Sequence, residues 1–235
     1  MLEAQDYKDG QVLLFDKPLE WSSFQLVNKV RWLIRKNLEI KKIKVGHAGT
    51  LDPLASGLMI ICTGKFTKRI NEFMGQPKTY TGTFYLGATT PSYDLETEID
   101  QEFPTAHITH EAIHAFAKAN TGIIQQRPPV FSALKKDGKR LYEYARAGEA
   151  VDIPLRETEI HSFEITRIAL PEVDFEVSCS KGTYIRSLAN DFGQGLGSGA
   201  HLTALRRTKI GAFDVDNAHT ISDFEAGFKT PKDEN

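Results

Sequence analysis

The chain has 235 residues, 40% of them hydrophobic and 26% charged, a balance typical of a globular protein that buries its core without disulfide or metal staples. Only two cysteines and a polar start without a secretory signal favour a reduced, cytoplasmic protein, and the longest apolar run, Leu58–Cys62, is too short to cross a bilayer. The net charge is −2, yet residues 1–80 carry 13 Lys and Arg against 8 Asp and Glu. Composition therefore permits a locally basic surface without establishing a nucleic-acid partner.

The first third of the chain predicts a strand, a capped helix and a glycine-rich loop. Ser22 and Ser23 are of the type that caps helices, and apolar residues recur at helical spacing after them. The expected elements are a strand at 11–15, a helix from Ser22–Ser23 to about Lys36, a loop from Gly46 that leads into an apolar strand, and a short helix at 66–74 closed by Gly75.

The rest of the chain predicts more strands than helices. Because these elements do not alternate regularly, we expect an α+β domain with a mixed, largely antiparallel sheet flanked by helices. The expected elements are strands at 78–86, 158–169, 173–180 and 202–210, an acidic connection at 94–102, helices from Thr109 to about Asn120 and from about Thr183, a basic insertion at about 124–156, and a disordered tail at 229–235.

Asp52 stands out as a candidate catalytic carboxylate. It lies in a loop in which glycines permit unusual backbone angles and Pro53 stiffens the chain after the carboxylate. An Asp-Pro pair after glycine is also a common turn. Here, however, the loop also contains His47 and runs into an apolar strand, which would present the carboxylate at the rim of a rigid core.

This loop resembles the catalytic loop of the TruB family of tRNA pseudouridine-55 synthases, whose pattern is Gly-x-Leu-Asp-Pro-x-Ala-x-Gly-x-Leu. Further stretches resemble family motifs in the same order, so that the agreement extends from about residue 11 to about residue 213. The loop matches are Gly49, Leu51, Asp52, Pro53, Ala55, Gly57 and Leu58, and the other stretches are Asp16-Lys17-Pro18 with Ser22-Ser23, Lys78-Thr79-Tyr80, Gly182–Leu188, and Leu205–Thr208 with Gly211.

The insertion resembles the RNA-gripping thumb of the same family. It begins with Pro128-Pro129 and combines basic groups, which can neutralise phosphates, with aromatic rings, which can stack on bases. A solvated helix with its tyrosines in the core would have a similar composition. The residues expected to contact RNA are Lys135, Lys139 and Arg146, with Phe131, Tyr142 and Tyr144 as the aromatic partners.

The resemblance implies a role for each remaining candidate. Asp52 would be the essential carboxylate, either adding to C1′ of the uridine or removing the 2′ proton, and Arg186 would keep it ionised. Tyr80 would stack on the target uracil, and its hydroxyl would assist proton transfer. The substrate-binding candidates are His47, which would fill the gap left by the flipped uridine, Leu205, which would line the uracil pocket, Lys17, which would shape the site from behind, and Tyr184 of the arginine motif.

The resemblance also implies the partner and the cofactor requirement. Isomerisation of uridine needs no redox step, phosphate energy or metal, and the chain has neither a phosphate-binding glycine loop nor a Cys/His ligand cluster. We therefore expect no cofactor, the T-arm of tRNA as substrate, and a monomer that needs no protein partner. About twenty residues follow Gly211, so a single catalytic domain without the C-terminal RNA-binding (PUA) domain of many relatives is expected.

Three alternatives compete with this interpretation. A dyskerin-like enzyme that works with a guide RNA shares the motifs but normally has the extra C-terminal domain. An RNA-binding or RNA-folding protein with secondary or no catalytic activity would not need Asp52, Tyr80 and Arg186 together. A glycosidase is disfavoured because no second carboxylate is marked near Asp52.

Overall fold

The computed structural model describes residues 2–229 and divides them into two units. We call the first the Asp52 unit, which runs up to Thr79 and resumes at Arg206, and the second the Arg186 unit, Tyr80–Leu205. Two strands, β4 (Lys78–Leu86) and β12 (Ala200–Ile210), contribute residues to both. Residues 230–235 of the expected disordered tail lie outside the described residues.

The Asp52 unit is built on antiparallel strands. β3 is paired with β1 from Val12 opposite Cys62 to Lys17 opposite Gly57, and it also pairs with β2. The apolar side chains of β3 form the core with residues from α3, β12 and η2. The elements of this unit are α1 (Ala4–Asp9), β1 (Val12–Lys17), α2 (Ser23–Asn37), β2 (Val45–His47), β3 (Ala55–Thr63), η1 (Gly64–Arg69), α3 (Ile70–Met74), β13 (Phe213–Asp214), η2 (Val215–Asn217) and α7 (Ile221–Gly227).

Helix α2 begins where the sequence predicts. The Ser22 hydroxyl accepts a hydrogen bond from the Gln25 N–H at 3.2 Å, and the Gln25 side chain accepts one from the Ser22 N–H at 2.7 Å. This reciprocal capping box satisfies two backbone donors that a helix start otherwise leaves unpaired. The apolar face of α2 is fully buried at Leu26, Val30 and Ile34.

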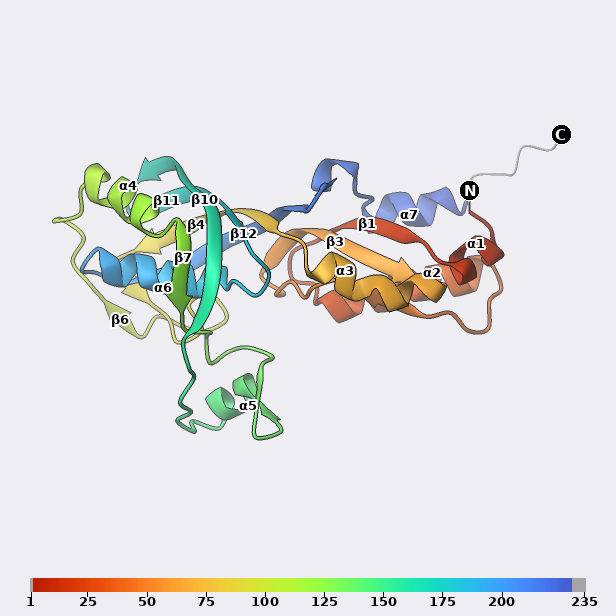
Figure 1. Ribbon diagram of the computed structural model, residues 1–235, viewed down its shortest axis with the longest axis horizontal. Coiled ribbons are helices and arrows are strands. Elements are labelled where there is room, and N and C mark those ends of the chain that lie inside the picture. The colour runs from red at the N-terminus through yellow and green to blue at the C-terminus, as the bar shows by residue number, and fades with distance from the viewer. Residues whose placement is uncertain (1, 230–235) are drawn as a thin grey trace. The chain divides into compact units, whose positions relative to one another are not determined.

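The Arg186 unit has strands in the order β12-β4-β11-β10-β7, with α4 and α6 beside them (Figure 1). Its core is aromatic: Phe84 of β4 stacks on Phe175 of β11 at 4.1 Å between ring centroids and also contacts Phe192 of α6. The other elements are β5 (Ala88–Thr89), β6 (Gln101–Glu102), α4 (His110–Ala119), β7 (Gly122–Gln126), β8 (Lys135–Lys136), β9 (Lys139–Arg140), α5 (Leu141–Arg146), β10 (Arg156–Ala169), β11 (Glu172–Cys179) and α6 (Ile185–Gly195).

The expected α+β class with a largely antiparallel sheet is confirmed, as are the long elements α2, β4, α4, β10, β11 and β12. Several short strands differ from expectation, among them β2, β5, β6, β7 and β13. His47 lies in β2 rather than in a loop, β6 falls inside the expected acidic connection, and β7 occupies the start of the expected insertion. Strands of two to five residues are too short to show the alternation on which a sequence prediction depends.

Between β7 and β10 the chain makes an excursion that contains β8, β9 and α5; we call residues 127–155 the thumb segment (Figure 1). Both cysteines, Cys62 and Cys179, are buried. Among the described helices, none combines the length and apolar character needed to cross a membrane.

Candidate functional site

The backbone on the N-terminal side of Asp52 is held by the buried side chain of Arg207. From β12 its guanidinium donates to the carbonyl oxygens of Leu58 at 2.8 Å, Gly49 at 3.3 Å and Thr50 at 3.4 Å. Arg207 is only 1% exposed, and a buried charge is tolerated only when its donors are satisfied in this way. One arginine therefore joins the loop before Asp52 to the strand after it.

Glycine is required where this strand meets Arg207. Gly57 has a φ of 108°, and a Cβ placed there would lie 2.3 Å from the carbonyl oxygen of Arg207. Gly49, on the other side of Asp52, has a φ of 109°. The glycine spacing in the sequence thus corresponds to two backbone conformations that other residues rarely adopt.

The two neighbours of Asp52 are fixed as well. The Ser23 hydroxyl accepts from the Leu51 N–H at 2.8 Å and donates to the Leu51 carbonyl at 2.9 Å. The ammonium group of Lys17 donates to the carbonyls of Trp21 at 2.6 Å and Pro53 at 3.5 Å. Asp52 itself is only partly buried, and it lies in a loop whose flanking residues are held by these hydrogen bonds.

Burial shapes the charge of the two other candidates in this unit. It lowers the pKa of Lys17 to about 8, an effect that the Asp52 carboxylate partly offsets and the Arg207 charge reinforces. Burial also lowers the pKa of His47, so the imidazole is neutral at pH 7. The structure therefore brings Lys17, His47 and Asp52 together around Arg207, with a neutral rather than cationic His47.

In the Arg186 unit, Arg186 is held by the segment that follows β5. Its Nε lies 3.5 Å from a carboxylate oxygen of Asp94, and its Nη1 donates to the Ser92 carbonyl at 3.2 Å. The Arg186 and Asp94 side chains are 7% and 8% exposed. An ion pair this buried helps to fix the position of the arginine, because separating the two charges would lose the attraction that offsets the cost of burying them. The predicted pairing of Arg186 with Asp52 stays a prediction.

The other candidates of this unit lie on different elements. Tyr80 is a buried residue near the start of β4, and Leu205 is half-buried in the middle of β12. Tyr184 is the N-cap residue of α6, two positions before Arg186. The structure thus places Tyr184 and Arg186 at one helix start, and Tyr80 and Leu205 on two neighbouring strands of the sheet.

In the thumb segment, two of the predicted RNA-contact residues already have partners. The Lys139 ammonium lies 4.3 Å from the Tyr144 ring centroid and 2.9 Å from a Glu149 carboxylate oxygen. The Arg146 guanidinium lies 5.4 Å from the Tyr142 ring centroid. A phosphate approaching these cations would compete with carboxylates and aromatic faces, whereas Lys135 is exposed in β8.

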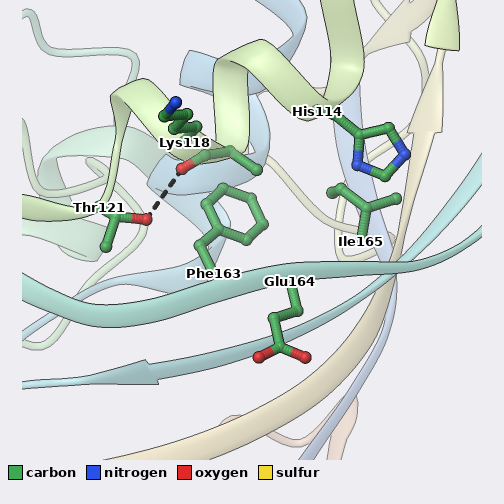
Figure 2. Close-up of a pocket in the computed structure, with 7 residues that line it drawn as sticks. His114, Lys118, Thr121, Phe163, Glu164 and Ile165 are labelled. Carbon is green, nitrogen blue, oxygen red and sulfur yellow. Dashed lines mark hydrogen bonds between the residues drawn. The ribbon is translucent and has the colours of Figure 1, made fainter. Parts of the chain in front are cut away.

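An open groove of about 640 Å³ lies between α4 and β10 of the same unit. Figure 2 shows Phe163 and Ile165 on the α4 side of β10, whereas Glu164 points away. The Thr121 hydroxyl donates to the Ala117 carbonyl at 3.0 Å beside it. None of the predicted site residues lines this groove, so the groove is separate from the candidate residues in its own unit.

The sequence does not predict the supporting roles of four residues: Ser23, which is hydrogen-bonded to Leu51, Asp94, the ion-pair partner of Arg186, Gln126, which is hydrogen-bonded to Tyr184, and Arg207, which supports the Asp52 loop. Ser23 and Arg207 fall within quoted motifs, but their roles depend on contacts with distant segments. Asp94 begins a stretch that is acidic throughout, and nothing in its spacing distinguishes it from the other carboxylates.

Comparison with known protein families identifies the family to which the chain belongs. Residues 35–185 match the model of the TruB family pseudouridylate synthase (N terminal domain), and residues 186–235 match that of the tRNA pseudouridylate synthase B C-terminal domain. The chain belongs to the TruB family of pseudouridylate synthases, which are isomerases. The family assignment made from the motifs is therefore confirmed.

The relatives agree over nearly the whole chain. A protein of Flavobacterium johnsoniae named tRNA pseudouridine synthase B is 67% identical over 95% of this chain and 98% of its own length. A protein of the same name from Phocaeicola vulgatus is 54% identical over 93% of each chain. Among solved structures, a chain of a Cbf5-Nop10-Gar1 complex is 29% identical to this protein, with a TM-score of 0.71. The match covers 94% of this protein and 55% of the Cbf5-Nop10-Gar1 chain.

Proposed function

We propose that this protein converts a uridine in the T-loop of tRNA, at position 55, to pseudouridine. The C1′–N1 bond breaks, the uracil turns, C1′ joins C5, and the C5 proton is lost while N1 gains one from solvent. The 54–67% identity to proteins named tRNA pseudouridine synthase B supports tRNA as the substrate, and it disfavours a guide-dependent enzyme or a purely RNA-folding protein.

The observation that carries the proposal is the fixed presentation of Asp52. Arg207, Ser23 and Lys17 hold the residues around it by hydrogen bonds, while Asp52 remains partly exposed. A carboxylate that must approach C1′ or the 2′ proton of a flipped nucleotide gains most from such preorganisation, because misplacement by about 1 Å can cost about 10²-fold in rate. A simple turn aspartate would not need three separate supports.

The other site residues take supporting roles in this mechanism. Arg186 would keep Asp52 ionised while Asp94 and Ser92 keep Arg186 in place. Tyr80 would stack on the uracil and assist proton transfer at C5. His47, Leu205 and Tyr184 would contact the flipped nucleotide or the space it leaves, and the neutral imidazole of His47 suits stacking among bases.

RNA binding would fall to the thumb segment. Lys135 is exposed, and Lys139 and Arg146 can exchange their contacts with Glu149 and Glu96 for phosphates. Such exchange costs little because exposed ion pairs contribute little. We further propose that the enzyme works in the cytoplasm as a monomeric catalytic domain, without cofactor or protein partner.

The test is release of tritium from a T-arm stem-loop that carries uridine tritiated at C5. Wild type should release the label, and Asp52→Asn should abolish release while leaving RNA binding largely intact, because the amide keeps the shape and loses the charge. Asp9→Asn is the matched control, since Asp9 is exposed and pairs with surface groups of its own unit.

Turnover by Asp52→Asn at the wild-type rate would refute the role of Asp52. A stem-loop with cytidine at the target position should release no label if the site specificity is right. Absence of release by the wild type from both the stem-loop and full-length tRNA, despite measurable binding, would instead favour an RNA-folding role.

A further inference from the structure

The side chain of Gln126 binds both backbone groups of a single distant residue. Gln126 is the last residue of β7 and is 2% exposed. Its Oε1 accepts from the Tyr184 N–H at 2.8 Å, and its Nε2 donates to the Tyr184 carbonyl at 3.0 Å. The amide thus pairs with Tyr184 as a neighbouring strand would, across 58 positions of sequence.

This pair of hydrogen bonds fixes the start of α6. Tyr184 is the N-cap residue, and tyrosine is not among the residue types whose side chains usually cap helices. Gln126 instead holds the backbone from outside the helix. Arg186 follows two residues later and must reach the Ser92 carbonyl and the Asp94 carboxylate at the same time.

Both ends of the thumb segment are hydrogen-bonded to the stretch of chain around Arg186, residues 180–187. Where it leaves β7, the Arg127 carbonyl accepts from the Ser187 hydroxyl at 2.7 Å. Where it returns in β10, the Thr158 hydroxyl lies 3.0 Å from that of Ser180 and is hydrogen-bonded to that of Thr183. Residues on both sides of Arg186 are therefore hydrogen-bonded to Arg127 and Thr158, at the two ends of the thumb segment.

We propose that Gln126 is a positioning residue: it holds Arg186 in place for catalysis and links the start of α6 to the residues at the two ends of the thumb segment. The inference rests on the proposed function, in which Arg186 acts on the charge of Asp52. Replacing the amide by a carboxylate keeps the size but, in the ionised form, sets an oxygen against the Tyr184 carbonyl in place of the N–H donor. The assays are run at about pH 9, because a buried carboxyl that stayed protonated would still donate there. Because the pair is buried, water cannot readily repair the loss.

The experiment compares Gln126→Glu with Gln125→Glu, the same change at the adjacent, exposed residue of β7. In single-turnover assays with full-length tRNA, Gln126→Glu should lower the rate constant by about 10- to 100-fold while the Kd for tRNA stays within about threefold. Gln125→Glu should leave both at the wild-type values. Equal rate constants for the two variants would overturn the inference, as would a loss confined to tRNA affinity.

Hydrogen exchange distinguishes a local loosening of the backbone around Arg186 from a loss of overall stability. In Gln126→Glu, amides 184–188 should exchange at least about tenfold faster than in Gln125→Glu, with β1 and β3 unchanged. If Gln126→Glu does not fold, Ser187→Ala, which removes the hydroxyl bound to Arg127, should still lower the rate constant about 3- to 10-fold at unchanged Kd. A wild-type rate for Ser187→Ala in that case would overturn the inference.

The same assays keep the two proposals apart. A wild type that releases label together with an unimpaired Gln126→Glu would refute the positioning role and leave the proposed function intact. A wild type that releases none would refute the proposed function and, with it, any catalytic role for Gln126, whatever the exchange at residues 184–188.

Discussion

Removal of the charge on Asp94 should displace Arg186 and slow catalysis without abolishing it. The two groups are 3.5 Å apart with side chains 7% and 8% exposed. At an effective dielectric constant of about 20, two unit charges at this distance attract by about 5 kcal/mol, part of which is offset by their desolvation. Asp94→Asn keeps an oxygen near Arg186 and loses the charge.

We expect Asp94→Asn to lower the free energy of unfolding by about 2–3 kcal/mol, which corresponds to about 5–10 °C in Tm for a chain of this size. Because Arg186 keeps its Ser92 contact, the single-turnover rate constant should fall by about 10²-fold rather than to zero. Thermal unfolding followed by circular dichroism and tritium release at a temperature well below Tm measure the two effects.

The control is Asp100→Asn in the same acidic stretch, where the exposed carboxylate accepts from the Thr89 hydroxyl at 2.7 Å and an amide oxygen can replace it. Its Tm and rate should equal those of wild type. If Asp94→Asn matched Asp100→Asn in both measurements, the buried ion pair would not be what holds Arg186.

Three further changes test the remaining supports. Burial lowers the pKa of Lys17 from 10.5 to about 8, so between pH 8 and pH 10.5 the unfolded chain binds this proton more tightly than the folded chain does. The free energy of unfolding should therefore rise with pH in this range, by up to about 1.4 kcal/mol per pH unit. Urea unfolding of Lys17→Met should lack this rise, and an equal dependence of the unfolding free energy on pH in the two proteins would contradict the prediction. Gly57→Ala should lower the free energy of unfolding by about 2–5 kcal/mol, because its Cβ would lie 2.3 Å from the Arg207 carbonyl oxygen. Gly122 also has a positive φ, of 99°, but has open space around it, so Gly122→Ala should lower the free energy of unfolding by about 1–3 kcal/mol through backbone strain alone. Tyr80→Phe should lower kcat far more than tRNA affinity, and equal losses in both would indicate a purely structural tyrosine.

The predictable features depend on short-range patterns. The capping box at Ser22, the apolar spacing of α2 and the residue composition of β4 and β10 are local, so the sequence sufficed to place these elements. The glycines on either side of Asp52 likewise mark local backbone conformations, and both have positive φ. The sequence predicts a loop at His47 because the three residues of β2 carry no strand pattern of their own, and only pairing with β3 makes them a strand.

The contacts that hold the candidate residues in place were decided by the tertiary structure alone. Arg207 reaches back to the carbonyls of Gly49 and Leu58, Asp94 pairs with Arg186, and Gln126 with Tyr184. Each contact joins residues separated by 58 to 158 positions. In such contacts a side chain meets a backbone group or a single opposite charge, and neither leaves a periodicity or a spacing in the sequence. The sequence thus indicated Asp52 as the candidate carboxylate and the TruB family as that of the chain. Burial and hydrogen bonding between distant segments determined how the residues around Asp52 are held and, separately, how Arg186 is held.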